Sequence, residues 1–300
     1  MRALGRSILT ALGIILLATA VPAAAQDKSK TIVYAHGPWS QGLFATQVTR
    51  LMLERIGYKV ELKLLDTALV YQSLASGKAD LFSSAYLPGQ QAYFNRNPGK
   101  LDLISISYGP LPGGLAVPSY VPVNSIEDLK KPEVKKMFGG KITGMDAGAG
   151  VMRLTETAIK KYDLDMELVP SSMAAMTAAF KAAYDKKEPI VIVHACPHYL
   201  CAAYNIKFLE DPKQVYGVAR DFHVARVGFR EEFPDAAKLL ERLTIFGDQM
   251  SEALVWMEAE KIDAEQAAKR FIERNPDLVW YWIGDLDKKA QMPESLKAMN

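Results

Sequence analysis

The chain has 300 residues, of which 49% are hydrophobic, and it carries 36 basic and 34 acidic side chains. This length favours about two domains of roughly 150 residues each. Without Arg2 and Arg6 of the N-terminal segment, basic and acidic side chains balance at 34 each, which argues against nucleic acid or an anionic membrane as a general partner.

The first 25 residues have the pattern of a secretory signal. Arg2 and Arg6 precede an apolar stretch, 8–20, that is too short to span a bilayer. Small residues at 23–25 provide a cleavage site. We therefore expect 1–25 to be a signal peptide and the mature chain to be soluble in the periplasm.

After the signal segment, strand and helix patterns alternate at short spacing. This rhythm is typical of a mainly parallel sheet covered by helices. A proline- and glycine-rich stretch at 109–113, between two extended runs, predicts a crossover into a second domain. The first series consists of strand 31–35, a helix from Ser40 to Ile56, strand 59–65, helix 68–76 and strand 79–82.

A second series of the same kind begins at Gly140, and an extended segment at 214–226 leads back to the first domain. The pattern predicts an α/β fold with two lobes, one of residues 26–113 plus 218–300 and one of residues 114–217. An inter-lobe cleft is then the expected ligand site. The second series consists of strand 141–145, helix 151–162, strand 167–169, a helix capped by Ser171 or Ser172, and strand 190–193, with further helices over 234–283.

Two aromatic residues follow separate strands of the first series, Trp39 after the first strand and Tyr86 after the third. The carboxyl ends of parallel strands lie at one edge of a sheet, where ligands bind. Aromatic faces attract a methylated ammonium, which has no N–H to donate, by ~0.5–2 kcal/mol per ring. The two rings are therefore candidates for a cation-binding wall, although on spacing alone core packing is the favoured interpretation.

The turn that contains Gly148, Ala149 and Gly150 precedes the helix at 151–162. Glycines at such a turn let backbone N–H groups approach an anion at the helix N-terminus, for example a carboxylate. The alternative is an ordinary strand-to-helix turn.

The segment after strand 190–193 combines two histidines, two cysteines and a tyrosine at the end of a buried strand. Pro197 suits the first position of a helix, so we expect a helix over 197–204. In that helix Cys196 and Cys201 lie on different faces, beyond the ~7 Å Cα separation that a disulfide tolerates, which predicts free thiols. Zinc held by both cysteines and a histidine is a second possibility, although the ligand spacing is unusual.

Short motifs spread over essentially the whole mature chain resemble one family. They include Gly37-Pro38-Trp39-Ser40, Ala85-Tyr86-Leu87-Pro88, residues 144–150, Pro197-His198-Tyr199 and Asn275-Pro276. Together these motifs resemble those of periplasmic binding proteins for glycine betaine, proline betaine and choline. The resemblance implies a type II, Venus-flytrap fold, a role as the solute-binding protein of an ABC importer, a membrane permease as partner, a monomeric state, and neither a cofactor nor a metal.

The resemblance also implies where the ligand binds. The implied ligand-binding residues are Trp39, Tyr86, His194, Tyr199, Gly148, Ala149 and Gly150. Tyr86 and Ala195 stand where the family has tryptophans, so either His194 or Tyr199 fills the gap or the pocket accepts a larger solute. His194 can hydrogen-bond a polar ligand group if neutral, and the alternative is that the histidines are structural.

Other functions remain open at this point. The same fold can bind a different solute, such as a larger amine or an amino-acid derivative, or it can feed a chemoreceptor. An enzyme that uses a cysteine and a histidine is the third possibility. Against an enzyme, the sequence has neither a G-x-S-x-G elbow nor an H-E-x-x-H metal motif.

Overall fold

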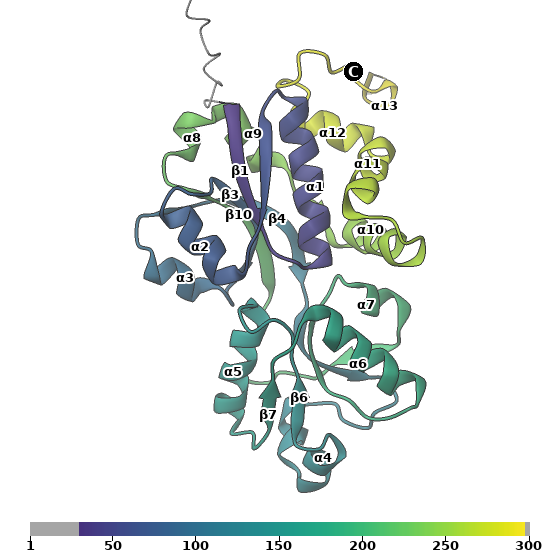
Figure 1. The fold of residues 1–300 in the computed structure, drawn as a ribbon. Coiled ribbons are helices and arrows are strands. Elements are labelled where there is room, and N and C mark those ends of the chain that lie inside the picture. Colours follow the sequence, from purple (N-terminus) through teal and green to yellow (C-terminus); the bar gives the residue numbers. More distant parts are fainter. Residues whose placement is uncertain (1–29, 298–300) are drawn as a thin grey trace, which may run out of the picture.

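The computed structural model describes residues 30–297, so the expected signal peptide lies outside the described residues. Two β-sheets, each covered by helices, lie one beyond the other along the length of the molecule (Figure 1). Over 30–297 no helix combines the length and the apolar character needed to cross a membrane.

The first sheet has six strands in the order β11-β4-β10-β3-β1-β2. β1 pairs in parallel with β2 and β3, whereas β10 runs antiparallel between β3 and β4. The sheet is therefore mixed, where the strand–helix rhythm predicted a mainly parallel one, because β10 enters from the other sheet. Its strands are β1 Thr31–His36, β2 Lys59–Leu64, β3 Leu81–Leu87, β4 Leu101–Leu111, β10 Ala219–Arg226 and β11 Ile245–Phe246.

The second sheet has five strands in the order β7-β6-β8-β5-β9. It is also mixed, because β5 pairs antiparallel with β8 and β9 while β6 is parallel to its neighbours. The chain passes between the sheets at Pro112, inside the predicted crossover, and returns between β9 and β10. The strands are β5 Gly113–Pro118, β6 Lys141–Thr143, β7 Glu167–Val169, β8 Ile192–Ala195 and β9 Ile206–Phe208.

Helices cover both sheets, and side chains define where several of them begin. Asp66 accepts a hydrogen bond from Leu69 N at the start of α2, and Asp263 does the same for Gln266 N at the start of α11. The helices are α1 Ser40–Arg55, α2 Thr67–Ala75, α3 Gln91–Arg96, α4 Pro132–Met137, α5 Gly150–Tyr162, α6 Met173–Asp185, α7 Tyr199–Ala203, α8 Phe229–Glu232, α9 Pro234–Arg242, α10 Gly247–Ala259, α11 Ala264–Arg274, α12 Pro276–Ile283 and α13 Glu294–Lys297, with a 3₁₀ helix at Ile126–Lys130.

The long helix α1 shows how the core is built. Its apolar stripe buries Phe44, Val48 and Met52 completely or nearly so. Phe44 also meets Phe271 of α11 edge to face, with ring centroids 5.5 Å apart. The C-terminal helices thus form a second layer over α1, on the side away from α2 and α3 (Figure 1).

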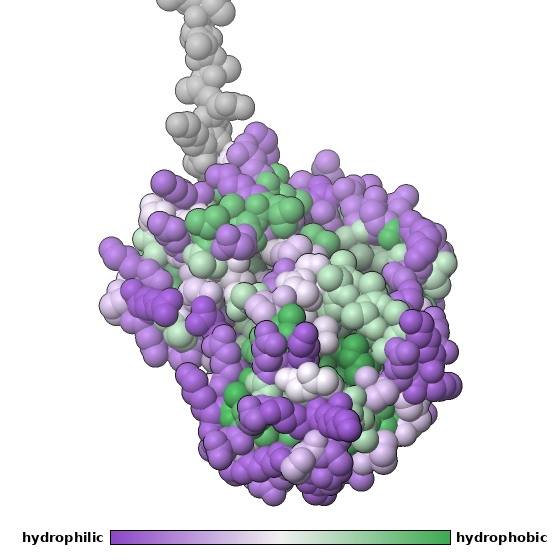
Figure 2. Space-filling view, turned by 60° about the horizontal axis from the view of Figure 1, so that its bottom comes forward, coloured by the Kyte–Doolittle hydropathy of each residue, from purple (hydrophilic) through white to green (hydrophobic). Residues whose placement is uncertain are grey.

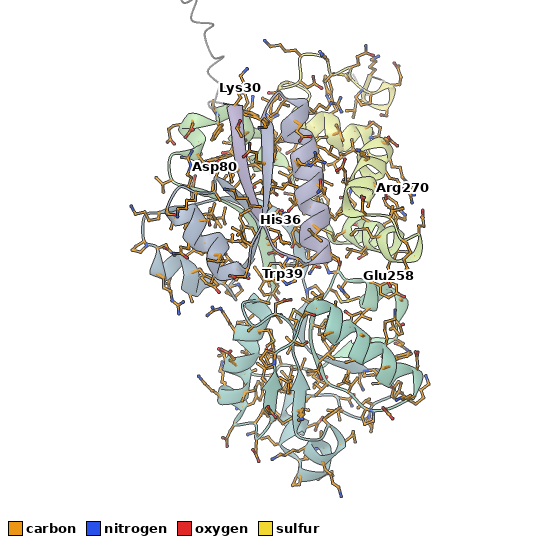
Figure 3. The ribbon with its side chains drawn as sticks, in the orientation of Figure 1. Lys30, His36, Trp39, Asp80, Glu258 and Arg270 are labelled. Carbon is orange, nitrogen blue, oxygen red and sulfur yellow. A yellow bond between two sulfur atoms is a disulfide. The ribbon has the colours of Figure 1, made fainter. Side chains whose placement is uncertain are left out.

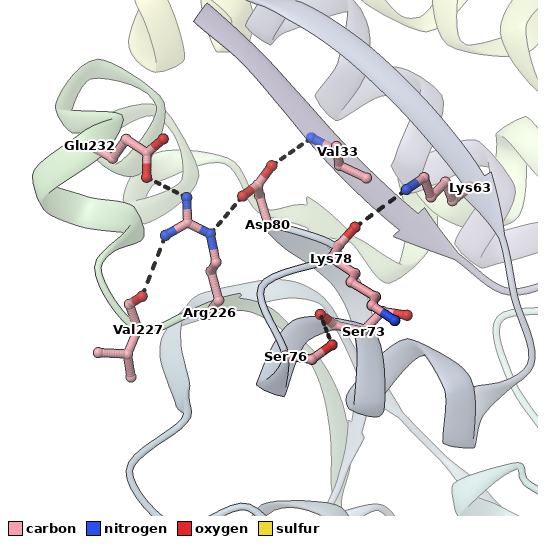
Figure 4. Close-up of polar contacts among 9 residues, drawn as sticks. All are labelled: Val33, Lys63, Ser73, Ser76, Lys78, Asp80, Arg226, Val227 and Glu232. Atoms are coloured by element: carbon pink, nitrogen blue, oxygen red, sulfur yellow. Dashed lines mark hydrogen bonds and ion pairs between the residues drawn. The ribbon is translucent and has the colours of Figure 1, made fainter. Parts of the chain in front are cut away.

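Asp80, just before β3, joins three strands of the first sheet. One carboxylate oxygen accepts from Val33 N of β1 at 2.7 Å, and the other accepts from Arg226 Nε of β10 at 2.7 Å. Arg226 also pairs with Glu232 of α8 (Figure 4). The outer surface is mainly hydrophilic where Figure 2 views it, with smaller hydrophobic areas between the polar residues.

Candidate functional site

A cavity lies between the two sheets. Its empty space, including open solvent at the mouth, is about 480 Å³. The side towards the first sheet is lined by Trp39, Gln41, Ser84, Tyr86, Gln90, Tyr108, Leu111 and Asp221, and the side towards the second sheet by Met145, Ala149, Gly150, Val151, Met173 and Ala195.

Trp39 lies at the boundary between the two halves, where α1 begins (Figure 3). Its ring packs so closely over Gly37 that a Cβ there would lie 2.7 Å from the ring. The indole Nε1 donates to Asp146 Oδ2 at 3.2 Å, and Asp146 belongs to the turn after β6. The ring therefore faces the cavity while its N–H bonds the opposite half.

Tyr86 occupies the predicted position at the end of β3 and lines the same cavity as Trp39. A Cβ on Gly150 would lie 2.5 Å from the ring, so only glycine allows this contact. Tyr108 of β4 contributes a third aromatic ring that sequence reasoning missed. Its signal was its place at the end of the extended run that precedes the proline- and glycine-rich stretch 109–113, at the same sheet edge as the other two rings.

Asp221 of β10 is the second residue that the sequence did not reveal. It is only 4% exposed and lies in register with Tyr86 on one neighbouring strand and Tyr108 on the other. Burial raises the pKa of its carboxyl group to about 8, and a hydrogen bond from Tyr108 opposes this rise. The available signal in the sequence was an acidic residue inside the predicted extended segment 214–226, which is otherwise partly apolar.

The turn before α5 reaches the cavity only in part. Ala149, the N-cap residue, and Gly150, the first residue of α5, line it. Gly148 lies instead in an adjoining hollow, where a Cβ would be 3.2 Å from Thr67. Ala149 already donates its N–H to the carbonyl oxygen of Asp146 at 2.8 Å, so Gly150, at the start of α5, is the residue of this turn that can offer a backbone N–H group to a ligand.

His194 and Tyr199 lie outside this cavity, contrary to expectation. Adjacent residues of a strand point to opposite faces, and in β8 Ala195 faces the cavity while His194 is fully buried behind it. The His194 ring packs edge to face on His198, and burial lowers the pKa of His194 well below its usual value, so it is neutral. Tyr199 lines a separate groove beside Lys181.

The expectation of free thiols is wrong, because Cys196 and Cys201 form a disulfide with a Cα separation of 6.2 Å. The reason is that the helix starts later than Pro197. His198 caps it, accepting from Leu200 N at 3.2 Å, and α7 begins at Tyr199. Pro197 and His198 therefore separate Cys196 from the helix, and His198 is extended, so the helical-face argument does not apply. Although both sulfur atoms lie close to a ring nitrogen of His194, the bridge leaves no thiol for zinc in the part of the chain described.

Further contacts join the two halves beside the cavity. Arg153 of α5 donates to the Tyr93 hydroxyl at 2.7 Å, and its guanidinium lies 4.5 Å from the centre of that ring. Nearby, a Cβ on Gly89 would lie 2.5 Å from the carbonyl oxygen of Gly150. The halves are thus closed on one another around the cavity.

Two helix-covered mixed sheets, two chain crossings and a cavity between them define a two-lobe binding protein of the type II periplasmic class, as expected. The sequence identifies the family: residues 30–274 match the substrate binding domain of ABC-type glycine betaine transport systems, and the chain belongs to this family. This membership confirms the resemblance and makes the chain a substrate-binding component of a transport system rather than an enzyme.

Individual relatives agree with this assignment. A glycine betaine/carnitine transport binding protein of Listeria monocytogenes is 39% identical over 165 residues, which is 54% of either chain, so the match spans about half the length of that relative. The glycine betaine/L-proline-binding protein of Borrelia burgdorferi is 30% identical, with a TM-score of 0.80 over 90% of this chain and 99% of that one. A lactococcal binding protein, closed on glycine betaine, is 31% identical, with a TM-score of 0.78 over 84% and 99%.

Proposed function

We propose that the protein captures a small quaternary amine or related zwitterion, of the glycine betaine and choline kind, and delivers it to the membrane permease of an ABC importer. The observation that carries the proposal is the meeting of Trp39, Tyr86 and Tyr108 in one cavity between the sheets. Three ring faces suit a methylated ammonium, which offers no N–H donors and interacts through the ring quadrupole. Membership of the glycine betaine family supports the same solute class.

The opposite side of the cavity suits the anionic end of a zwitterion. Ala149 and Gly150 line it at the N-terminus of α5. The first N–H groups of a helix have no partner within the helix, and the helix dipole favours negative charge there. A betaine would therefore lie with its ammonium among the rings and its carboxylate towards α5.

Binding would work through closure of two lobes, residues 26–113 plus 218–300 and residues 114–217, in a monomer. Contacts available only in the closed form shift the population towards it. The bonds of Trp39 to Asp146 and of Arg153 to Tyr93 are contacts of this kind. Segment 1–25 would direct the chain to the periplasm, where it would be removed. Small-angle scattering should show a smaller radius of gyration when ligand is added.

A larger solute is the second candidate, because Ala195 lines the cavity where the family resemblance places a tryptophan. Calorimetry with glycine betaine, choline, carnitine, trimethylamine N-oxide and amino acids separates the two. A ligand at about 100 times its dissociation constant should also add ~2.7 kcal/mol to the free energy of unfolding. Tight binding of carnitine alone favours the larger solute, and absence of binding to any methylated amine refutes the proposal.

A further inference from the structure

Asp221 is the only acidic side chain that lines the cavity within the described residues, and no lysine, arginine or histidine lines it there. It is the third residue of β10, paired with Tyr86 of β3 on one side and Tyr108 of β4 on the other, and it is almost wholly buried. The carboxyl group thus shares its wall of the cavity with two of the three aromatic rings.

No basic group compensates this carboxyl group among residues 30–297. The titratable side chains that face it are tyrosines, namely Tyr86 from β3, Tyr108 from β4 and Tyr71 from α2. The neighbouring Arg220 packs over Gly109, with its Cγ 3.2 Å from the position of a Cβ there. Nor is Asp221 a member of any salt bridge in the part of the chain described.

The remaining nearby titratable group on the same strand does not help either. His223 hydrogen-bonds Ser83 and the carbonyl oxygen of Leu243, and burial lowers its pKa to about 4, so it is neutral near pH 7. A carboxylate without a cation in such surroundings is costly, and the group responds by holding its proton. This accounts for a pKa of about 8 for Asp221 in the ligand-free cavity.

We infer that Asp221 is the counter-charge for the ligand, so that the cavity selects solutes with a permanent positive charge over uncharged solutes of the same shape. This inference rests on the proposed function and adds to it a residue that distinguishes a positively charged ligand from an uncharged ligand of the same shape. The aromatic rings already favour an ammonium over a tert-butyl group through cation–π attraction, and a buried carboxylate adds a second preference that depends on the charge.

The inference also links binding to a proton. A cation placed among the rings favours the ionised form of Asp221, which must release its proton when the ligand binds below the pKa of the free site. The affinity should then rise with pH, by at most about tenfold per unit, and level off above the pKa of about 8.

Carbon isosteres test the inference directly. In 3,3-dimethylbutan-1-ol a carbon atom replaces the nitrogen of choline, and 3,3-dimethylbutanoate is related to glycine betaine in the same way. The wild type should bind each ammonium compound at least about tenfold more tightly than its carbon isostere, and Asp221→Asn should reduce this preference by about tenfold to a hundredfold. Asp102→Asn, which alters an acidic residue paired with Arg230 away from the cavity, is the matched control and should leave the preference unchanged.

The pH dependence provides the second readout. Between pH 6 and 8 the wild type should bind choline more tightly as the pH rises, and Asp221→Asn should show no such slope. An unchanged preference in Asp221→Asn, with choline still bound, overturns the inference and leaves the proposed function standing. Failure of the wild type to bind choline and glycine betaine overturns the proposed function, and the inference with it.

Discussion

Replacement of Trp39 examines the aromatic wall and the link between the two lobes at the same time. The side chain is 8% exposed, faces the cavity and donates its indole N–H to Asp146 across the boundary. Trp39→Ala removes the ring and this hydrogen bond together. Trp39→Phe retains a ring face but removes the donor.

The magnitude follows from these contacts. One ring face contributes ~0.5–2 kcal/mol to binding of a cation, and a hydrogen bond to a charged group contributes about 1.5–3 kcal/mol at most. With partial compensation by solvent, we expect Trp39→Ala to cost about 2–4 kcal/mol of binding free energy, which is a roughly 30- to 1,000-fold weaker complex. Trp39→Phe should lose only about tenfold, chiefly through the bond to Asp146.

Calorimetry with the tightest-binding methylated amine measures these losses. Asp146→Ala removes the same bond and also the acceptor of the Met173 N–H at the start of α6, so it should cost at least as much as Trp39→Phe, and the double variant should be no worse than Asp146→Ala alone. Trp256→Phe, on α10 between Arg270 and Arg274 and outside the cavity, is the control. Unchanged affinity in a folded Trp39→Ala protein would remove the aromatic wall from the mechanism.

Three further variants test the fold around the site. Gly89→Ala should weaken ligand binding at least about tenfold, because its Cβ would lie 2.5 Å from a carbonyl oxygen of the facing lobe in the closed form. It should not lower the melting temperature of the ligand-free protein. Gly247→Ala is the control, since the nearest atom to its Cβ would be 4.0 Å away. Thiol counting in denaturant without reductant should find no free thiol, and Cys196→Ser should lower the free energy of unfolding by about 2 kcal/mol, the value for so short a loop; a native protein with two reactive thiols contradicts this. Asp80→Ala should cost about 1–3 kcal/mol in urea unfolding, since it leaves Val33 N without its acceptor and Arg226 paired with Glu232 alone, and a loss below about 0.5 kcal/mol shows that the pair is merely a surface bridge.

The sequence predicted the elements whose signals are local. Hydrophobic periodicity located most strands and helices, and the end of each of two strands placed Trp39 and Tyr86 at one sheet edge. Tyr108 and Asp221 were not found because they reach the cavity through pairing of β10 with β3 and β4, which brings together residues more than 100 positions apart. No local sequence pattern predicts that β10 pairs with β3 and β4.

Two other errors come from short-range geometry that the sequence leaves undecided. Strand alternation requires that His194 and Ala195 face opposite ways, but it does not say which of them faces the cavity. Only the packing of β8 between β5 and β6 decides this. The prediction of free thiols depended on where α7 begins. The helix begins at Tyr199, two residues after the predicted start, and this difference was enough to turn predicted free thiols into a disulfide.

The bond between Arg153 and Tyr93 has a consequence for how affinity and selectivity can vary. Neither residue lines the cavity, so the pair meets no ligand, yet it joins the two lobes. Under the proposed closure, its strength sets the fraction of molecules that are closed before binding, and the apparent affinity for every ligand scales with that fraction. Substitutions at this pair would therefore multiply all dissociation constants by one factor, while substitutions at Asp221 or Trp39 would reorder them. Substitutions at Arg153 or Tyr93 could therefore adapt the affinity of the protein to scarce or abundant solute without changing which solute it recognises.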